Sequence, residues 1–245
     1  MSLPLRVLGL LRRHGWNATS FQILEPGFRY WFDGDDACIG YVDTGRAWVV
    51  AGAPIAPPER FPDLARAFVA HARQAGKRVV FFATESRFRD AVDWRALRIG
   101  EQPTWSPEEW TATLEGSRSL REQLRRARAK GVRIRRLAPD ELAPGHPTRA
   151  RLDSMIARWL ASRPMAPMGF LVQVDPYTIP DERHAFVAEI GDRLIGFLGV
   201  IPIYARGGWF FEDFLGDPDA PNGTVESLID AGMRAAAADR IAYVT

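Results

Sequence analysis

The sequence predicts an α/β (α+β) fold of two similar halves, each built on a mixed, mainly antiparallel sheet. Three observations support this prediction. The 245 residues are 47% hydrophobic and 25% charged, which is the balance of an ordinary globular protein. Short aromatic and β-branched runs alternate with amphipathic stretches of helical spacing. Turn residues separate these segments in both halves. We expect an N-terminal domain at 1–112 and a C-terminal domain at 113–245.

The first half is expected to contain strands and one amphipathic helix. Asp43-Thr44-Gly45-Arg46 supplies hairpin turn chemistry between two apolar runs, and Gly76 stops the helix. The continuous apolar run that follows the helix is typical of a buried strand. The expected elements are a strand at 20–33, a hairpin at 37–51, a helix at 62–74 and a strand at 78–83.

The N-terminal segment Leu3–Leu11 is apolar but short, and Arg6 interrupts it. We expect a helix that docks on the domain, although short basic amphipathic helices also lie on anionic lipid. No apolar run approaches the roughly 20 residues of a membrane-spanning helix. The lone Cys38 excludes an intramolecular disulfide. The four His are scattered without metal-ligand spacing, so no metal site is expected.

The second half is expected to begin with a strongly basic helix that Gly131 ends. The expected elements are helices at 117–130, 148–162 and 225–238 and strands at 132–137, 185–190, 194–203, 209–215 and 241–244. Two helices, three antiparallel strands, a helix and a strand follow the order of an acetyltransferase-like (GNAT) domain. The first half echoes this order loosely. Tandem GNAT-like domains are therefore predicted from element order alone.

The segment Asp217-Pro-Asp-Ala-Pro-Asn-Gly-Thr224 joins a strand to the last helix. Asn222-Gly223 permits positive φ, and Thr224 is a candidate N-cap. Free N–H groups and the helix dipole at such a junction favour a phosphate, a carboxylate or a developing oxyanion. The same residues also fit a well-capped helix start that binds nothing.

Glu212 and Asp213 are adjacent acids in the aromatic strand just upstream. Carboxylates are costly to bury without partners. Strand alternation is expected to send the two side chains to opposite faces, unless a bulge intervenes. One of them could serve as a general base or bind an ammonium group. Alternatively, they partner a nearby Arg or cap a helix.

The segment Arg118–Arg136 holds nine basic residues and one acid, Glu122. It carries a charge of +8, whereas the rest of the chain sums to −6. Such a surface suits the phosphates of RNA or anionic lipid, although acids of other elements could also neutralise it. The candidate phosphate-binding residues are Arg118, Arg121, Arg125, Arg126, Arg128 and Lys130.

Glu101 and Gln102 precede a loop that Pro103 interrupts and are candidates to line a substrate pocket, although a plain connector also fits.

The sequence contains no P-loop, no Gly-x-Ser-x-Gly elbow and no dinucleotide fingerprint. The pyrophosphate loop typical of acetyl-CoA-binding GNAT proteins is absent from the strand–helix junction. Plain acetyl-CoA use is therefore disfavoured, and no cofactor is expected.

Several segments resemble one known family. They are Gly15–Phe21, Tyr41–Gly45, Ala51–Ala56 and Ile99–Glu101 in the first half, and Ser119–Arg121, Arg126–Gly131 and Asp219–Gly223 in the second. The family is that of the phosphatidylglycerol lysyltransferase C-terminal domain, the cytosolic catalytic part of the multiple peptide resistance factor. The resemblance covers nearly the whole chain. Its most specific piece is Asp-Ala-Pro-Asn-Gly between a strand and a helix.

The resemblance implies two tandem GNAT-like domains in a soluble, cytoplasmic, bacterial aminoacyltransferase. The donor would be aminoacyl-tRNA, and the acceptor a lipid, as in the membrane-bound members, or another small molecule. Glu212 and Asp213 would lie near the amino-acid substrate, and the basic helix would face the tRNA or a lipid headgroup. The amides of Asn222, Gly223 and Thr224 would then stabilise the oxyanion of the ester.

Three departures from the family pattern bear on this expectation. The membrane flippase portion is missing. Gly216 stands where members usually have an Arg. The chain stops at Thr245, where members continue, and a sheet without its last strands is expected to have an exposed edge. Two alternatives stay open: an N-acyltransferase that uses acyl-CoA or another thioester, and a non-catalytic GNAT-like module that binds RNA or anionic membranes.

Overall fold

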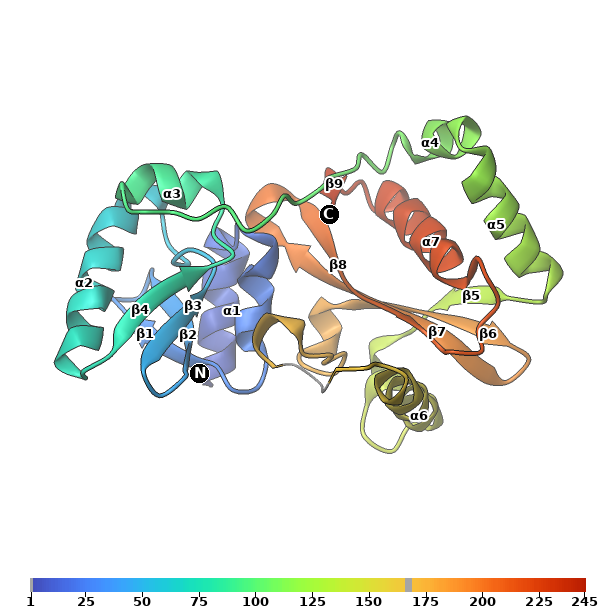
Figure 1. Ribbon diagram of the computed structural model, residues 1–245, viewed down its shortest axis with the longest axis horizontal. Coiled ribbons are helices and arrows are strands. Elements are labelled where there is room, and N and C mark those ends of the chain that lie inside the picture. Colours follow the sequence, from blue (N-terminus) through green and yellow to red (C-terminus); the bar gives the residue numbers. More distant parts are fainter. Residues whose placement is uncertain (1, 166–168) are drawn as a thin grey trace. The chain divides into compact units, whose positions relative to one another are not determined.

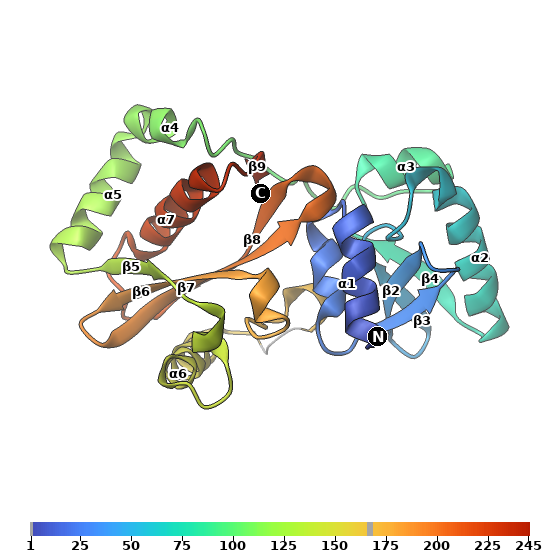
Figure 2. The ribbon, with the colours of Figure 1, turned by 180° about the vertical axis from the view of Figure 1, so that it is seen from behind.

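The computed structural model describes residues 2–165 and 169–245, and these form two compact units (Figures 1 and 2). The first unit comprises the chain through Gln102 together with Gly169–Val172 and Ile203–Arg206, and the second comprises the remaining segments. The chain thus passes from one unit to the other earlier than the boundary expected at 112. The reason is that Trp105, in the connector, pairs with the second unit through backbone hydrogen bonds to Val244.

The first unit is built on a four-stranded sheet in the order β1-β2-β3-β4. The three antiparallel strands β1 to β3 are followed by α2, which returns the chain so that β4 lies parallel to β3. The helix buries Phe68 against Trp48 and Val50 of β3. The elements are α1 (Leu3–His14), η1 (Ala18–Leu24), β1 (Arg29–Phe32), β2 (Cys38–Asp43), β3 (Ala47–Ala51), η2 (Pro58–Arg60), α2 (Phe61–Gln74), β4 (Arg78–Phe82) and α3 (Ser86–Val92).

Two expectations for this unit were wrong in part. The strand expected at 20–33 is confined to β1, because η1 buries the apolar residues before it as a 3₁₀ helix and Gly27, at φ 98°, turns the chain. The strand expected to be fully buried at 78–83 is an edge strand. Its residues Val80 and Phe82 remain exposed, since α2 covers only the face that carries Val79 and Phe81.

The second unit is built on a five-stranded sheet in the order β5-β6-β7-β8-β9. Strands β5 to β7 pair antiparallel, and β9 is parallel to β8. The elements are α4 (Trp110–Gly116), α5 (Arg118–Ala129), β5 (Arg133–Arg136), η3 (Pro139–Leu142), α6 (Pro147–Ala161), η5 (Pro180–Glu182), β6 (His184–Ile190), β7 (Arg193–Ile203), β8 (Gly208–Gly216), α7 (Thr224–Ala238) and β9 (Tyr243–Val244). The remaining short helices, η4 (Phe170–Val172) and η6 (Tyr204–Arg206), belong to the first unit.

Helices cover both faces of this second sheet (Figure 1). On one face α7 packs Leu228 and Met233 into a cluster with Phe211, and α5 lies against α7. On the other face α6 packs Leu152 and Met155 into a separate cluster. The predicted α/β fold of tandem GNAT-like domains with mixed sheets is confirmed. In the described part of the chain, none of the helices combines the length and apolar character needed to cross a bilayer.

The edge of the sheet beyond β9 carries the connector at one point. The Trp105 amide donates to the Val244 carbonyl at 2.8 Å, and the Val244 amide donates to the Trp105 carbonyl at 2.9 Å. The Thr245 hydroxyl also donates to the Pro103 carbonyl at 2.7 Å. The edge that the sequence was expected to leave open is therefore paired at this position.

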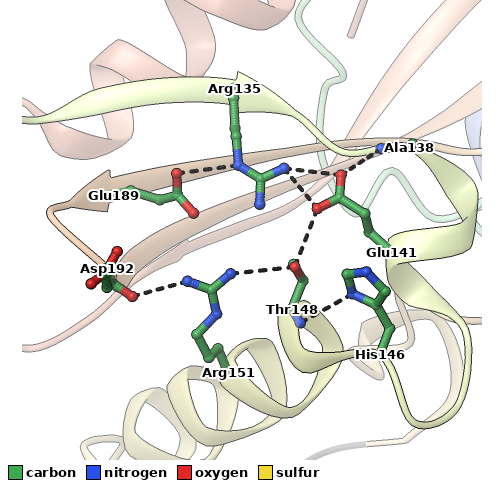
Figure 3. Close-up of polar contacts among 8 residues, drawn as sticks. All are labelled: Arg135, Ala138, Glu141, His146, Thr148, Arg151, Glu189 and Asp192. Atoms are coloured by element: carbon green, nitrogen blue, oxygen red, sulfur yellow. Dashed lines mark hydrogen bonds and ion pairs between the residues drawn. The ribbon is translucent and has the colours of Figure 1, made fainter.

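A polar network ties α6 to the sheet (Figure 3). Arg135 of β5 donates to both carboxylate oxygens of Glu141, at 2.8 and 2.9 Å, and to Glu189 of β6 at 3.2 Å. Glu141 also accepts hydrogen bonds from the Ala138 amide and the Thr148 hydroxyl. Although burial opposes it, these donors lower the pKa of Glu141. The network fixes the start of α6.

We predict that Glu141→Ala destabilises the second unit by about 2–3 kcal/mol, because Arg135 then loses its bidentate partner in a half-buried setting. Urea unfolding measures the change. Glu115→Ala is the matched control, since within the described residues the Glu115 side chain has no partner, and it should change stability by less than about 0.5 kcal/mol. Equal effects of the two substitutions would contradict the role given to the network.

Candidate active site

A cavity of about 500 Å³ opens at the start of α7. One wall comes from α5, and the other from the loop that follows β8 and the first turn of α7. Its lining residues are Ser119, Glu122, Gln123, Arg126, Gly216, Asp217, Ala220, Pro221, Asn222, Gly223, Thr224, Val225 and Glu226. The structure therefore places the predicted residues Asn222, Gly223 and Thr224 together with Arg126 of the basic helix.

Gly223 is required where the two walls meet. Its φ is 92°, and a Cβ at this position would overlap the carbonyl oxygen of Gln123. Gly223 rather than Thr224 is the N-cap residue of α7, so the expected cap was wrong. The Thr224 hydroxyl donates instead to the Pro221 carbonyl at 2.6 Å, and its amide donates to the same oxygen at 3.1 Å.

The first turn of α7 presents free N–H groups to this cavity. Within the described residues, the amides of Val225 and Glu226 donate to no backbone carbonyl outside the helix, whereas Ser227 already bonds to Gly223. Such amides and the helix dipole favour negative charge that develops nearby. The acids Glu122 and Glu226 also line the cavity, beside the cation Arg126. The lining is therefore less suited to a permanent polyanion. It is better suited to a neutral, polar group that gains negative charge during a reaction.

Glu212 and Asp213 lie in β8, upstream of the cavity, and are not among its lining residues. Phe211 packs in the α7-side cluster, whereas Leu215 packs in the α6-side cluster. Residues four apart in a regular strand share a face, so the alternation of β8 is interrupted between them. Both carboxyls join one group of charges as a result, which is the exception that the expectation of opposite faces allowed for a bulge.

The two carboxyls have different surroundings. Glu212 accepts a hydrogen bond from Arg183 at 2.5 Å, and both side chains are less than 5% exposed. Asp213 is 8% exposed, and its Oδ2 has no hydrogen-bond partner. Burial and the neighbouring charge of Glu212 raise the pKa of Asp213 to about 7, although Arg183 opposes the shift. A carboxyl with such a pKa can accept and release a proton near neutral pH.

The acid that opens the cavity loop is fully paired. The Asp217 side chain is inaccessible to solvent, and it accepts hydrogen bonds from Arg158 of α6 at 2.7 Å and Arg193 of β7 at 2.8 Å. The Asp219 amide adds a third donor at 3.1 Å. Burial opposes the effect of these donors, which lower the pKa of Asp217. The loop is thus held by two cations although Gly216 lacks a side chain.

The cations of α5 are partly occupied. Glu122 accepts hydrogen bonds from Arg125 at 2.8 and 2.9 Å and from Arg126 at 2.9 Å. Arg121 donates to the last carbonyls of α4, and Arg128 lies 3.7 Å from Asp230 of α7. Among the described residues, no acid or other partner contacts Arg118 or Lys130.

Glu101 and Gln102 are exposed in the connector, where Glu101 pairs with Arg98. The described contacts bring neither residue to the cavity or to the carboxyl pair, so their role remains a prediction.

The sequence did not identify Arg183, Arg158 or Arg193. The sequence indicated only that acids lie in apolar strands, and such acids need cations from another element when they are buried. The described residues contain no cluster of His, Cys, Asp and Glu that could hold a metal ion.

Comparisons with known proteins identify the family to which the chain belongs. The profile of the family described as "Phosphatidylglycerol lysyltransferase, C-terminal" matches residues 8–245. The lysylphosphatidylglycerol biosynthesis bifunctional protein LysX of Gordonia bronchialis is 27% identical over 206 residues. That match includes 80% of this chain but 18% of LysX, so the chain spans less than a fifth of the length of this curated relative.

Two solved structures share the fold. L-PGS from Bacillus licheniformis superposes with a TM-score of 0.86 at 19% identity, over 98% of this chain and 74% of that one. The C-terminal domain of a protein described as a lysylphosphatidylglycerol synthetase from Agrobacterium fabrum gives 0.84 at 20% identity, over 98% and 76%. At these identities the likeness concerns the fold. With the profile match across the chain, it follows that this protein belongs to the phosphatidylglycerol lysyltransferase C-terminal family.

Proposed function

We propose that this chain transfers an aminoacyl group from aminoacyl-tRNA to a lipid or another small acceptor. The observation that carries the proposal is Asp213, a buried carboxyl with an unpartnered oxygen and a near-neutral pKa. It lies on the strand that leads directly into a polar cavity with free helix N–H groups. Family membership makes aminoacyl transfer the reaction class that these features serve.

The proposed reaction needs no covalent intermediate on the protein. The acceptor oxygen forms the new ester bond to the aminoacyl carbonyl carbon, and the bond from that carbon to the tRNA ribose oxygen breaks. The free amides of Val225 and Glu226 in the first turn of α7, next to the predicted residues Asn222, Gly223 and Thr224, stabilise the oxyanion. Glu212 or Asp213 accepts the acceptor's proton, which then passes to the ribose oxygen, or binds the amino acid's ammonium group. Glu101 and Gln102 stay candidates for substrate contact.

The donor is proposed to be aminoacyl-tRNA rather than acyl-CoA. Three acids, Glu122, Asp217 and Glu226, line the cavity with one cation, Arg126, and this disfavours the pyrophosphate of coenzyme A. The exposed cations of α5 provide phosphate contacts for tRNA. Since charged tRNA is made in the cytoplasm, the proposal also implies a cytoplasmic site of action, with peripheral contact to anionic lipid where the acceptor is a phospholipid.

Transfer can be tested directly by following radiolabel from a pool of charged tRNAs into lipid and other small acceptors. We expect label with the unmutated chain and at least a hundredfold less with the Glu212→Gln, Asp213→Asn double variant, because proton transfer contributes about 10²–10⁴-fold to such reactions. The labelled fraction identifies the acceptor class.

Absence of label from a folded, unmutated chain would contradict the proposal. Thermal stabilisation by coenzyme A would then favour a thioester donor, because a ligand stabilises the state that binds it. Binding of RNA or liposomes that is unchanged in the double variant, with no transfer, would favour a non-catalytic module.

If the basic helix α5 binds tRNA, two kinds of substitution on it should have opposite effects on tRNA affinity. Arg118→Gln with Lys130→Gln should lower the log–log salt slope of tRNA affinity by about one to two, because each lost phosphate contact contributes roughly 0.7–0.9. Glu122→Gln should raise affinity at low salt, since it releases Arg125 and Arg126 from their shared acid. Fluorescence anisotropy at several salt concentrations measures both effects.

The matched control for charge is Arg66→Gln with Arg73→Gln on α2, which removes two exposed cations from the first unit. It should leave the salt slope unchanged. An equal fall in slope for both double variants would show that net charge, rather than α5, determines binding.

A further inference from the structure

The Arg183–Glu212 pair is one of the most deeply buried ion pairs in the described structure. The Arg183 side chain is 3% exposed and that of Glu212 is 4% exposed. Arg183 is itself held, because its Nε donates to the Thr178 carbonyl at 2.9 Å. The charge-assisted hydrogen bond of 2.5 Å joins two buried charges, and loss of either partner would leave the other uncompensated.

Asp213 is the next residue along the chain and has no such partner. Its Oδ2 is buried without a hydrogen bond. On the neighbouring strand β7 it faces Gly199, where a Cβ would lie 3.3 Å from the Asp213 Cβ and Oδ2. Glycine therefore leaves room beside this carboxyl. Phe197 is also close to the same position, so β7 contributes no charge here.

The charges that act on Asp213 come from three places. Glu212 is adjacent in β8, Arg183 precedes β6, and Asp175 lies in the segment before η5. The Asp175 carboxylate is already satisfied by the Thr178 hydroxyl at 2.6 Å and by the amides of Tyr177 and Thr178. Three acids thus share one cation, and that cation is committed to Glu212.

We infer that Arg183 is a positioning residue that divides the carboxyl pair between two roles. It holds Glu212 in a buried ion pair, and it leaves Asp213 as the group that exchanges a proton with substrate. The fixed charge of Glu212 in turn favours the protonated form of Asp213. The inference refines the proposed function, in which either carboxyl could act, but the protonation of the pair can be measured without any transfer reaction.

The test is a pH titration of the unmutated chain with ¹³C-labelled Asp and Glu carboxyls, followed by NMR. Glu212→Gln and Asp213→Asn assign the two signals. We expect the Asp213 carboxyl to titrate near pH 7. An Asp213 midpoint near the ordinary value of about 4 would overturn the inference.

Two substitutions should move the Asp213 midpoint in opposite directions. Glu212→Gln removes a like charge and lowers it, whereas Arg183→Met removes the opposing cation and raises it. A purely structural Arg183 would shift stability without this pair of opposite effects. Asp219→Asn is the control, because this exposed acid is not among the charges that act on Asp213, and it should leave the midpoint unchanged.

Arg183→Met strands the buried Glu212 and could unfold the chain, so Arg183→Lys provides a second measurement. It keeps the cation but cannot reach Glu212 and the Thr178 carbonyl together. We expect a folded chain in which Asp213 titrates near its original midpoint. An Asp213 midpoint that shifts as far in this variant as in Arg183→Met would contradict the division of roles, since the cation is still present. All of these experiments measure protonation of the carboxyl pair. A negative result in them can therefore be distinguished from a negative result in the label-transfer assay.

Discussion

Burial of acidic side chains is the constraint on which the second unit depends. Each of these acids draws at least one donor from another element. Asp217 binds cations from α6 and β7, and Glu141 binds one from β5. Asp230 of α7 accepts hydrogen bonds from Trp110 of α4 and from Arg234 of its own helix. These contacts fix how the helices lie on the sheet, because a stranded buried carboxylate would cost several kcal/mol.

Asp213 is the exception to this pattern, and the exception has a physical basis. The nearest cation, Arg183, is committed to Glu212, and the opposing residue on β7 is a glycine. Nothing else in the described surroundings offers Asp213 Oδ2 a hydrogen bond. Single carboxylate oxygens of Glu25, Glu85 and Glu212 are also buried without a hydrogen bond. Glu212 is nevertheless held by Arg183, whereas the Asp213 carboxyl can be satisfied by a proton or by a ligand's donor.

The order of helices and strands could be predicted from the sequence because it depends on local periodicity. The apolar stripe of α5, the Gly131 stop and the alternating strands β6 to β8 all lie within short windows. The partners of the charges could not be predicted, since Arg158 and Asp217 are 59 residues apart and Arg183 and Glu212 are 29 apart. The faces of Glu212 and Asp213 were also missed, because an interruption in strand alternation leaves no signal in composition. The 3₁₀ helix η1 was missed for a related reason: its buried apolar residues resemble a strand.

The cavity and the carboxyl pair contain complementary chemical groups at the two ends of one segment. The cavity offers N–H donors for a developing negative charge, and one of its acids is held by cations: hydrogen bonds from Arg125 and Arg126 lower the pKa of Glu122 to about 2. The strand offers a carboxyl that can hold a proton and whose Oδ2 accepts no hydrogen bond. Acyl transfer between two substrates needs both groups, one for the carbonyl oxygen and one for the proton.

The short loop between β8 and α7 connects them, and the Asp217 ion pairs and the close approach at Gly223 restrict its movement. That loop therefore sets the spacing between the carboxyl pair and the helix N–H groups, which the proposed reaction would use together.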